Sequence, residues 1–172
     1  MFQRICIGSD HGGYEMKTQL LSHLLEKGHE VVDMGSDSEE IVRYPYYAAQ
    51  VCRALQKGEC DAGILICSTG IGMSIAANKF RGIRAALCTS QVMAKMTRRH
   101  NDSNVLCLGG QISGLWETMD IVDTWVQEAY IGGRHEISLS MIAVGEGKTI
   151  HIEGWQPPRE LCPDSHSDGR RD

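Results

Sequence analysis

Several features that mark whole classes of protein are missing from this 172-residue chain. No apolar run approaches the roughly 20 residues that a membrane-spanning helix needs. The amino terminus, MFQRICIG, lacks the long apolar core of a signal peptide. We therefore expect a cytoplasmic protein that contacts no membrane. The formal net charge of −5 comes without the basic stripe that binds nucleic acid, so a small anionic ligand is the more compatible partner.

The cysteines are odd in number and contain no C-x-x-C pair. They are Cys6, Cys52, Cys60, Cys67, Cys88, Cys107 and Cys162. This spacing suggests neither a disulfide framework nor a zinc site. Most of the cysteines are expected to be small buried hydrophobic residues.

The composition is that of an ordinary globular protein, and the length suits one domain. Short apolar or β-branched runs predict five buried strands, at 5–8, 30–34, 62–67, 83–88 and 104–109. Helical patterns lie between them, two of which end before Gly28 and Gly132. Strand–helix alternation predicts an α/β fold, a single doubly wound domain around a parallel sheet with right-handed crossovers.

The composition of the sequence changes after residue 144. The last 28 residues, GEGKTIHIEGWQPPRELCPDSHSDGRRD, are rich in proline, glycine, serine and charge. We therefore predict a domain over 1–144 and a carboxyl-terminal extension over 145–172. The extension is expected to hold at most one short strand, KTIHIEGW at 148–155, before a disordered end.

Ligands of a doubly wound sheet bind outside the carboxyl ends of its strands. Three of the expected strands lead to residues that carry chemistry. The first strand runs into GSDHGG (8–13), the third runs into CSTGIG (67–72), and the fourth is followed by a helix that ends in RRHND (98–102).

Cys67 stands where an apolar strand gives way to small, hydroxylated and glycine residues. A glycine-containing loop lets a ligand approach the unpaired N–H groups at the start of a helix, which makes an anion site. Such amides favour the thiolate form of a cysteine. Cys67 is therefore a candidate base or nucleophile, and the alternative is that it only finishes a buried strand. The segment lacks the Gly-Lys-Ser/Thr ending of a P-loop.

The other candidate residues are ambiguous when taken singly. Asp10 and His11 can orient hydroxyls and bind phosphate, but an aspartate there can equally cap a helix beside an exposed histidine. His100 lies near a helix end, where a histidine more often interacts with the helix dipole than with a substrate. Arg134 and His135 follow two glycines and are compatible with a solvated cap or an anion clamp.

The joint order of five segments is specific. GSDHGG, RYPYYA, CSTGIGMSIAANKFRGIRAALC, HNDSNVLCLGG and GGRH together resemble the type B ribose-5-phosphate isomerase family, which includes the subunits of galactose-6-phosphate isomerase. The resemblance covers residues 4–142. It implies a five-stranded, flavodoxin-like parallel sheet, no metal and no cofactor. It also implies homodimers or homotetramers whose active sites take residues from two subunits.

The resemblance implies a role for Cys67 as the base that moves a proton between C2 and C1 of an open-chain sugar phosphate through a cis-enediolate. The amides from Ser68 to Gly72, with Gly70 and Ile71 between them, would stabilise the developing oxyanion. Ring opening would fall to His100, which reaches across the dimer interface, with Thr69 or Asp10.

The remaining positions implied by the resemblance are for substrate binding. They are His11 and Asn101, together with Arg134 and His135 from the partner subunit. A phosphate held at this end of the sugar would position the reacting carbons.

Three departures from the family pattern affect the expected phosphate end. Gln111 and Ser138 stand where many relatives carry arginine, whereas Arg43 stands where relatives have an acidic or neutral polar residue. Arg43 is therefore a further candidate for binding the substrate anion, and the alternative is an exposed arginine on a variable loop. Ser68 replaces a commoner glycine beside the base.

Ribose 5-phosphate is the expected substrate of an aldose–ketose isomerase. A tetrose 4-phosphate or a hexose 6-phosphate is the runner-up, and a non-catalytic sugar-phosphate-binding relative is the alternative from another class. A flavin carrier would share the sheet, but no motif calls for a flavin. A thiol redox protein would need a resolving cysteine near Cys67, and the spacing offers none.

Overall fold

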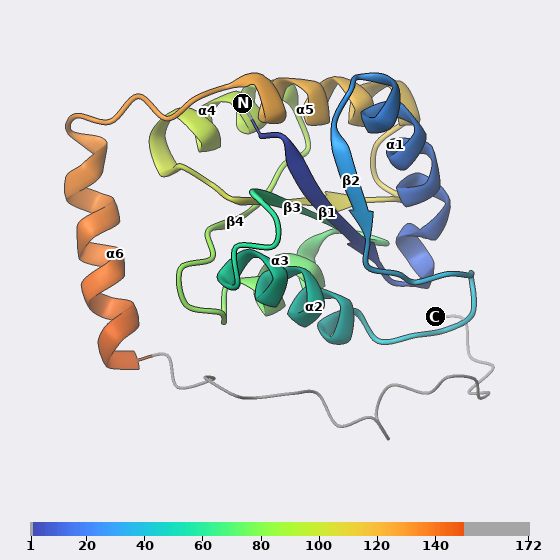
Figure 1. Cartoon of the computed structure of the whole chain (residues 1–172), viewed down its shortest axis with the longest axis horizontal. Coiled ribbons are helices and arrows are strands. Elements are labelled where there is room, and N and C mark those ends of the chain that lie inside the picture. The colour runs from blue at the N-terminus through green and yellow to red at the C-terminus, as the bar shows by residue number, and fades with distance from the viewer. Residues whose placement is uncertain (1, 150–172) are drawn as a thin grey trace.

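The five apolar runs form the five strands of one parallel sheet in the computed structural model, which describes residues 2–149 (Figure 1). The strands are β1 (Arg4–Ser9), β2 (Glu30–Asp33), β3 (Ala62–Cys67), β4 (Ala85–Leu87) and β5 (Val105–Gly109). Every neighbouring pair runs parallel. The predicted fold class and all five strands are confirmed.

The order of the strands is β2-β1-β3-β5-β4. It departs at one edge from the flavodoxin order, in which the fourth strand lies beside the third. The burial of β4 and β5 fits this exchange of their positions in the sheet. All five residues of β5 are buried, which suits an internal strand, whereas the three residues of β4 are only partly buried and suit an edge.

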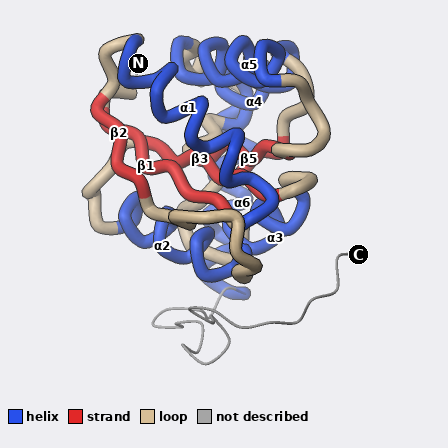
Figure 2. Tube along the Cα trace, turned by 90° about the vertical axis from the view of Figure 1, so that its right-hand side faces the viewer, coloured by secondary structure: helices blue, strands red, loops and turns tan. Residues whose placement is uncertain are grey.

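Helices cover both faces of the sheet. They are α1 (Tyr14–Glu26), α2 (Tyr44–Gln56), α3 (Ile71–Ala77), α4 (Gln91–Asn101), α5 (Leu115–Gln127) and α6 (His135–Thr149), with a short 3-10 helix, η1 (His11–Gly13). Figure 2 shows α1, α4 and α5 on one side of the strands, and α2 and α3 on the other. The sheet therefore separates two layers of hydrophobic core.

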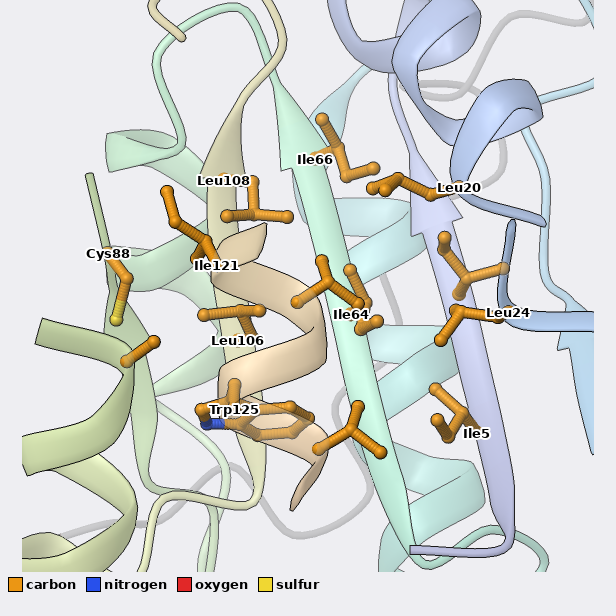
Figure 3. Packing of buried hydrophobic residues seen from close by; sticks show 14 of the residues in the cluster. Ile5, Leu20, Leu24, Ile64, Ile66, Cys88, Leu106, Leu108, Ile121 and Trp125 are labelled. Atoms are coloured by element: carbon orange, nitrogen blue, oxygen red, sulfur yellow. The ribbon is translucent and has the colours of Figure 1, made fainter. Parts of the chain in front are cut away.

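The larger core layer shows why the apolar residues of the helices recur at spacings of three and four. Leu20 and Leu24, one turn apart on α1, are fully buried, and so are Ile121 and Trp125 on α5. Figure 3 shows these side chains over the sheet, with Trp125 close to Leu106. The packing fixes α1 and α5 on this face, so the loops that precede them emerge at the carboxyl edge of the sheet.

Helix α6 was not predicted. It extends across the expected boundary at 144/145, and in Figure 1 it stands on the side of the sheet from which β1 begins. The strand expected at 148–155 is wrong at its first two residues, which belong to α6, and the rest of that segment lies outside the described residues. The division into 1–144 and 145–172 stays a prediction.

Helices of the described part of the chain are all too short or too polar to cross a membrane.

Two cysteines form a disulfide, which corrects the expectation from their spacing. Cys6 on β1 is bonded to Cys60, in the turn before β3, across a sequence separation of 54 residues. The sheet places the two residues side by side, because β1 and β3 are neighbours, and their Cα atoms are 6.0 Å apart. Four other cysteines are free and buried, as expected for small apolar residues: Cys52, Cys67, Cys88 and Cys107.

Candidate active site

Cys67 is the last residue of β3, and only 5% of its surface is exposed. The backbone N–H of Gly70 donates a hydrogen bond to its Sγ at 3.1 Å. Gly70 has a φ of +76°, a conformation that glycine adopts without strain, and this turn brings its N–H back toward the sulfur. The sulfur therefore lies within hydrogen-bond distance of a backbone amide at the carboxyl end of the strand.

The other three free thiols lie in different surroundings. Burial raises the pKa of Cys52 and of Cys88 to about 12, and it raises the pKa of Cys107 well above its usual value. These thiols are therefore protonated at neutral pH. Cys67 differs from them in standing at a strand end with an amide donor on its sulfur.

The loop after Cys67 carries further amide donors. Within residues 2–149, the N–H groups of Ser68, Thr69 and Gly72 have no hydrogen-bond acceptor, whereas the N–H of Ile71 is satisfied by Thr69 Oγ1. The helix that follows, α3, has only seven residues. Individual N–H groups, rather than a long helix dipole, therefore make this loop attractive to an oxyanion.

The loop after β1 lies against the loop that follows Cys67. Asp10 N–H donates to the carbonyl of Ile66, and a side chain on Gly12 would collide with the hydroxyl of Ser68. Asp10 Oδ1 accepts the N–H of Gly12. Asp10 therefore caps the short helix η1, which was the alternative role expected from the sequence. Burial raises the pKa of Asp10, and the positive charge of His11 and backbone N–H groups partly oppose this shift.

His11 is held by the loop that precedes α2. Its Nδ1 either accepts the N–H of Val42 at 3.3 Å or donates to the carbonyl oxygen of Val42 at 3.2 Å, depending on the tautomer. Because Val42 engages Nδ1 in either tautomer, Nε2 is the ring nitrogen left for a ligand.

Tyr44 belongs to the same surroundings and was missed from the sequence. Its ring lies against Gly72, where a Cβ atom would come within 3.0 to 3.1 Å of the ring atoms. The signal was the Tyr–Pro pair that begins α2, because a proline in the first turn fixes where the helix starts. Arg43 is the N-cap of that helix and is exposed, and its side chain forms no ion pair or hydrogen bond within the described residues.

Gln111 completes this edge of the sheet. Its N–H donates to the carbonyl of Ser68, and the N–H of Gly110 donates to the carbonyl of Cys67. The loops after β1, β3 and β5 are thus joined by backbone hydrogen bonds. We call Asp10, His11 and the segment 67–72 the thiol half-site.

The other predicted residues lie elsewhere. His100 and Asn101 end α4, and the ring of His100 stacks on the ring of His135 with centroids 4.1 Å apart and an angle of 11° between the planes. Desolvation lowers the pKa of His135, and the neighbouring charges of His100 and Arg134 lower it further. We call His100, Asn101, Arg134 and His135 the imidazole half-site.

The two half-sites lie at opposite edges of the sheet. The carbonyl of Asn101 accepts the Nε–H of Arg84, which directly precedes β4, so α4 ends where β4 begins. Cys67 ends β3 at the carboxyl edge. The structure therefore brings nine of the predicted site positions together at one edge, including Arg43, and gathers the other four at the opposite edge.

Among the described residues, no group of three or more His, Cys, Asp or Glu side chains is arranged as a metal site would require. The expectation of a metal-free and cofactor-free enzyme stays a prediction.

A doubly wound parallel sheet with a thiol, an imidazole and unpaired amides at its carboxyl edge defines an α/β enzyme for small anionic substrates. Within this class, the chain belongs to the ribose/galactose isomerase family, whose model matches residues 5–142.

Individual relatives agree with this membership. Ribose-5-phosphate isomerase B of Escherichia coli K12 is 47% identical over 144 residues, which are 84% of this chain and 97% of that protein. A solved ribose-5-phosphate isomerase B of Clostridium thermocellum is 49% identical, with a TM-score of 0.84 over 85% of this chain and 99% of that one. The type B enzyme of Trypanosoma brucei is 44% identical, with a TM-score of 0.82 over 85% of this chain and 100% of that one.

Proposed function

We propose that this chain interconverts ribose 5-phosphate and ribulose 5-phosphate. The observation that carries the proposal is the N–H of Gly70 on Cys67 Sγ, within a loop where the N–H groups of Ser68, Thr69 and Gly72 are unpaired among the described residues. The names of the similar proteins, which the chain matches over nearly their whole length, support the same substrate.

In this proposal the thiolate of Cys67 removes the proton from C2 of the open-chain aldose. The electron pair of the C2–H bond forms the C1–C2 double bond of a cis-enediolate, and the carbonyl oxygen becomes an oxyanion. The amides of Ser68, Thr69 and Gly72 are the donors for that oxygen. A proton then passes from the C2 hydroxyl to the C1 oxygen, and the thiol returns its own proton to C1, so that the C2 oxygen becomes the carbonyl of the ketose. The reaction moves protons only and needs no electron carrier.

We also propose that the working enzyme is a homodimer, or a homotetramer built from such dimers, with each active site shared between two chains. Helix α4 has 11 residues and spans roughly 16 Å, which is longer than a pentose phosphate. His100 and Cys67 of one chain cannot reach the same sugar. A second copy that offers its imidazole half-site to the thiol half-site would complete the site.

Exposed apolar side chains support this arrangement, because they lie on the three helices that begin or end in a half-site. They are Ile71 and Ile75 on α3, Val92, Met93 and Met96 on α4, and Ile137, Met141, Ile142 and Val144 on α6. In a twofold dimer, two different patches contact each other twice. One such interface would cover both patches and assemble two active sites.

The ends of the shared site have distinct tasks in this proposal. His100 of the partner subunit opens the sugar ring, with Thr69 or Asp10 on the near side. Asn101, Arg134 and His135 of the partner and His11 of the first chain bind the phosphate end. Arg43, at the same edge as His11, is the further cation for that anion.

A panel assay tests the chemistry. Ketose formation is measured from tetrose 4-phosphate, ribose 5-phosphate and hexose 6-phosphates, with the wild-type chain and with Cys67→Ala. We expect ribose 5-phosphate to give the highest kcat/KM. A preference for four or six carbons would reassign the substrate, and no turnover on any of them would indicate a binding protein.

A pair of variants tests the sharing of the site. Cys67→Ala and His100→Asn are co-expressed with different tags, and dimers that carry both tags are purified. Each homodimer should be inactive, whereas the mixed dimer keeps one intact site and should recover activity up to about half of the wild-type value. A mixed dimer as inactive as its parents would refute the shared site and leave the panel result unaffected.

The contribution of Arg43 has its own test. If its guanidinium binds the phosphate, Arg43→Ala should lower kcat/KM by about tenfold or more. An unchanged kcat/KM would indicate an exposed arginine on a loop.

The proposed location is the cytoplasm, where disulfides are uncommon. The Cys6–Cys60 bond gives this part of the proposal a direct check. Rapid acid trapping and alkylation in the cell, followed by peptide mass spectrometry, reports whether the two thiols are bonded there.

A further inference from the structure

We infer that Arg98 is a positioning residue for the imidazole half-site, and that it fixes His100 and the segment that leads to Arg134 and His135 in one arrangement. Arg98 does not reach the substrate in this inference. It acts by joining the end of α4 to the end of α5. The inference rests on the proposed function, because that proposal gives His100 its task.

Arg98 is buried although it carries a charge, and its side chain bonds to the residues that directly follow α4. Its Nη1 donates to Asp102 Oδ1 at 2.9 Å and to the carbonyl of Ser103 at 2.6 Å. Asp102 is the left-handed residue that ends the helix, with a φ of +45°, and its other carboxylate oxygen accepts from Arg84. The end of the helix, which carries His100, is therefore held by Arg98 from within the helix and by Arg84, which directly precedes β4.

The same guanidinium also reaches α5. Its Nε donates to the carbonyl of Glu128, the residue that caps the end of that helix, at 3.4 Å. Three residues later, the N–H of Ile131 donates to the carbonyl of Arg99 at 3.1 Å. The segment that leaves α5 is thus fastened to the last turn of α4 by these two hydrogen bonds. The exposed side of the same contact carries ion pairs of the Glu128 carboxylate with Lys95 at 3.6 Å and with Arg99 at 4.0 Å.

This fastened segment ends in the imidazole half-site. Gly132 and Gly133 both have positive φ, at 65° and 64°, and turn the chain so that the ring of His135 stacks on the ring of His100. A displacement of Glu128 relative to α4 would shift Arg134 and His135 away from His100. Arg98 is the buried side chain that resists this displacement.

Stability alone does not account for a charge at this position. The flat guanidinium lies 4.5 Å from the centroid of Phe2 and 5.9 Å from that of Trp125, so an apolar side chain would find apolar partners there. Buried ion pairs are often replaceable by apolar residues without loss of stability. An arginine is needed where several backbone carbonyls and a carboxylate must be held in one geometry, because its planar fork carries five N–H donors.

The experiment compares Arg98→Met with Arg98→Lys, and uses Arg4→Met as the control. Methionine keeps the length and the apolar contact but removes every donor, and lysine keeps the charge but loses the fork. Arg4 pairs with Glu30 at the exposed start of β1 and belongs to neither half-site. We expect kcat/KM to fall by about 10²-fold for methionine and about tenfold for lysine, and to stay within about twofold for the control.

A double-variant cycle separates positioning from simple loss of structure. If Arg98 acts through the imidazole half-site, adding His100→Asn to Arg98→Met should cost less than about threefold, whereas His100→Asn alone should cost about 10²-fold or more. An equal cost of His100→Asn in both backgrounds would overturn the inference. So would wild-type kcat/KM in Arg98→Met.

Mixed dimers address the possibility that Arg98→Met damages the whole chain. Paired with Cys67→Ala, an Arg98→Met chain should recover activity, because its own thiol half-site is intact. Paired with His100→Asn, it should not, because both defects lie in the same half-site. No recovery with Cys67→Ala, while the Cys67→Ala and His100→Asn pair recovers, would show that Arg98 is needed for the fold in general. If that reference pair also fails, the shared site is refuted, and the double-variant cycle alone decides the role of Arg98.

Discussion

Replacing Cys67 with alanine or with serine separates its chemistry from its packing. Both changes remove the thiolate, so both should lower the turnover of ribose 5-phosphate by about 10²- to 10⁴-fold. That range corresponds to about 2.7 to 5.5 kcal/mol of activation free energy.

The two variants should differ in stability, because of the N–H of Gly70 that Cys67 Sγ accepts. Alanine leaves this N–H without a partner in a buried place, which should lower the free energy of unfolding by about 1 to 3 kcal/mol. Serine offers an oxygen to the same N–H, so its cost should stay below about 1 kcal/mol.

The assay is steady-state ketose formation, together with urea unfolding of the same preparations. Cys88→Ala is the matched control, because it removes a buried free thiol that lies outside both half-sites. It should keep wild-type turnover. If Cys67→Ser keeps more than about a tenth of the wild-type turnover, Cys67 is a packing residue and the proposed mechanism fails. If alanine and serine are equally stable, the Gly70 hydrogen bond contributes nothing measurable.

Three further outcomes follow from the structure. The Cys6–Cys60 disulfide closes a loop of about 54 residues, so Cys60→Ser should lower the free energy of unfolding by about 4 kcal/mol, measured by urea titration without reductant. Among the free cysteines of residues 2–149, Cys67 should be the first alkylated by iodoacetamide at pH 8, and a bound substrate should slow the reaction; faster labelling of any of the other three, read by peptide mass spectrometry, would contradict the geometry. Burial raises the pKa of Asp10 in the folded state, so its ionisation opposes folding once the pH exceeds the unfolded value. Asp10→Asn keeps the cap and should unfold at higher urea than wild type at pH 7, and the difference should vanish as the pH falls below about 4; a difference that grows with acid would reverse the sign of the shift.

The periodicity of the apolar residues was enough to predict the sheet and most of the helices. Leu20 and Leu24 are buried one turn apart, and every residue of β3 is buried, so the pattern reflects packing directly. Helix α6 escaped this reasoning because its apolar side chains, such as Ile137 and Met141, lie on the outside of the chain. Two glycines near its end also resemble a loop.

The site was predictable in its members but not in its arrangement. Cys67, Asp10 and His11 follow strands, and strand ends meet at one edge, so their meeting could be deduced. The stacking of His100 on His135 depends on how the chain leaves α5, for which no local pattern exists. The disulfide likewise depends on β1 and β3 being neighbours, and a separation of 54 residues carries no signal of that.

The length of α4 has a consequence for how the enzyme would respond to its own concentration. In the proposed arrangement α4, which is roughly 16 Å long, carries the imidazole half-site away from the carboxyl edge, so a lone chain would have all the required groups and no complete site. By mass action, the population of complete sites in very dilute solution then grows with the square of the chain concentration, and doubling the amount of protein quadruples the rate. Catalysis would become proportional to protein only above the dissociation constant of the dimer, so the affinity between subunits sets the cellular abundance below which this reaction is effectively switched off.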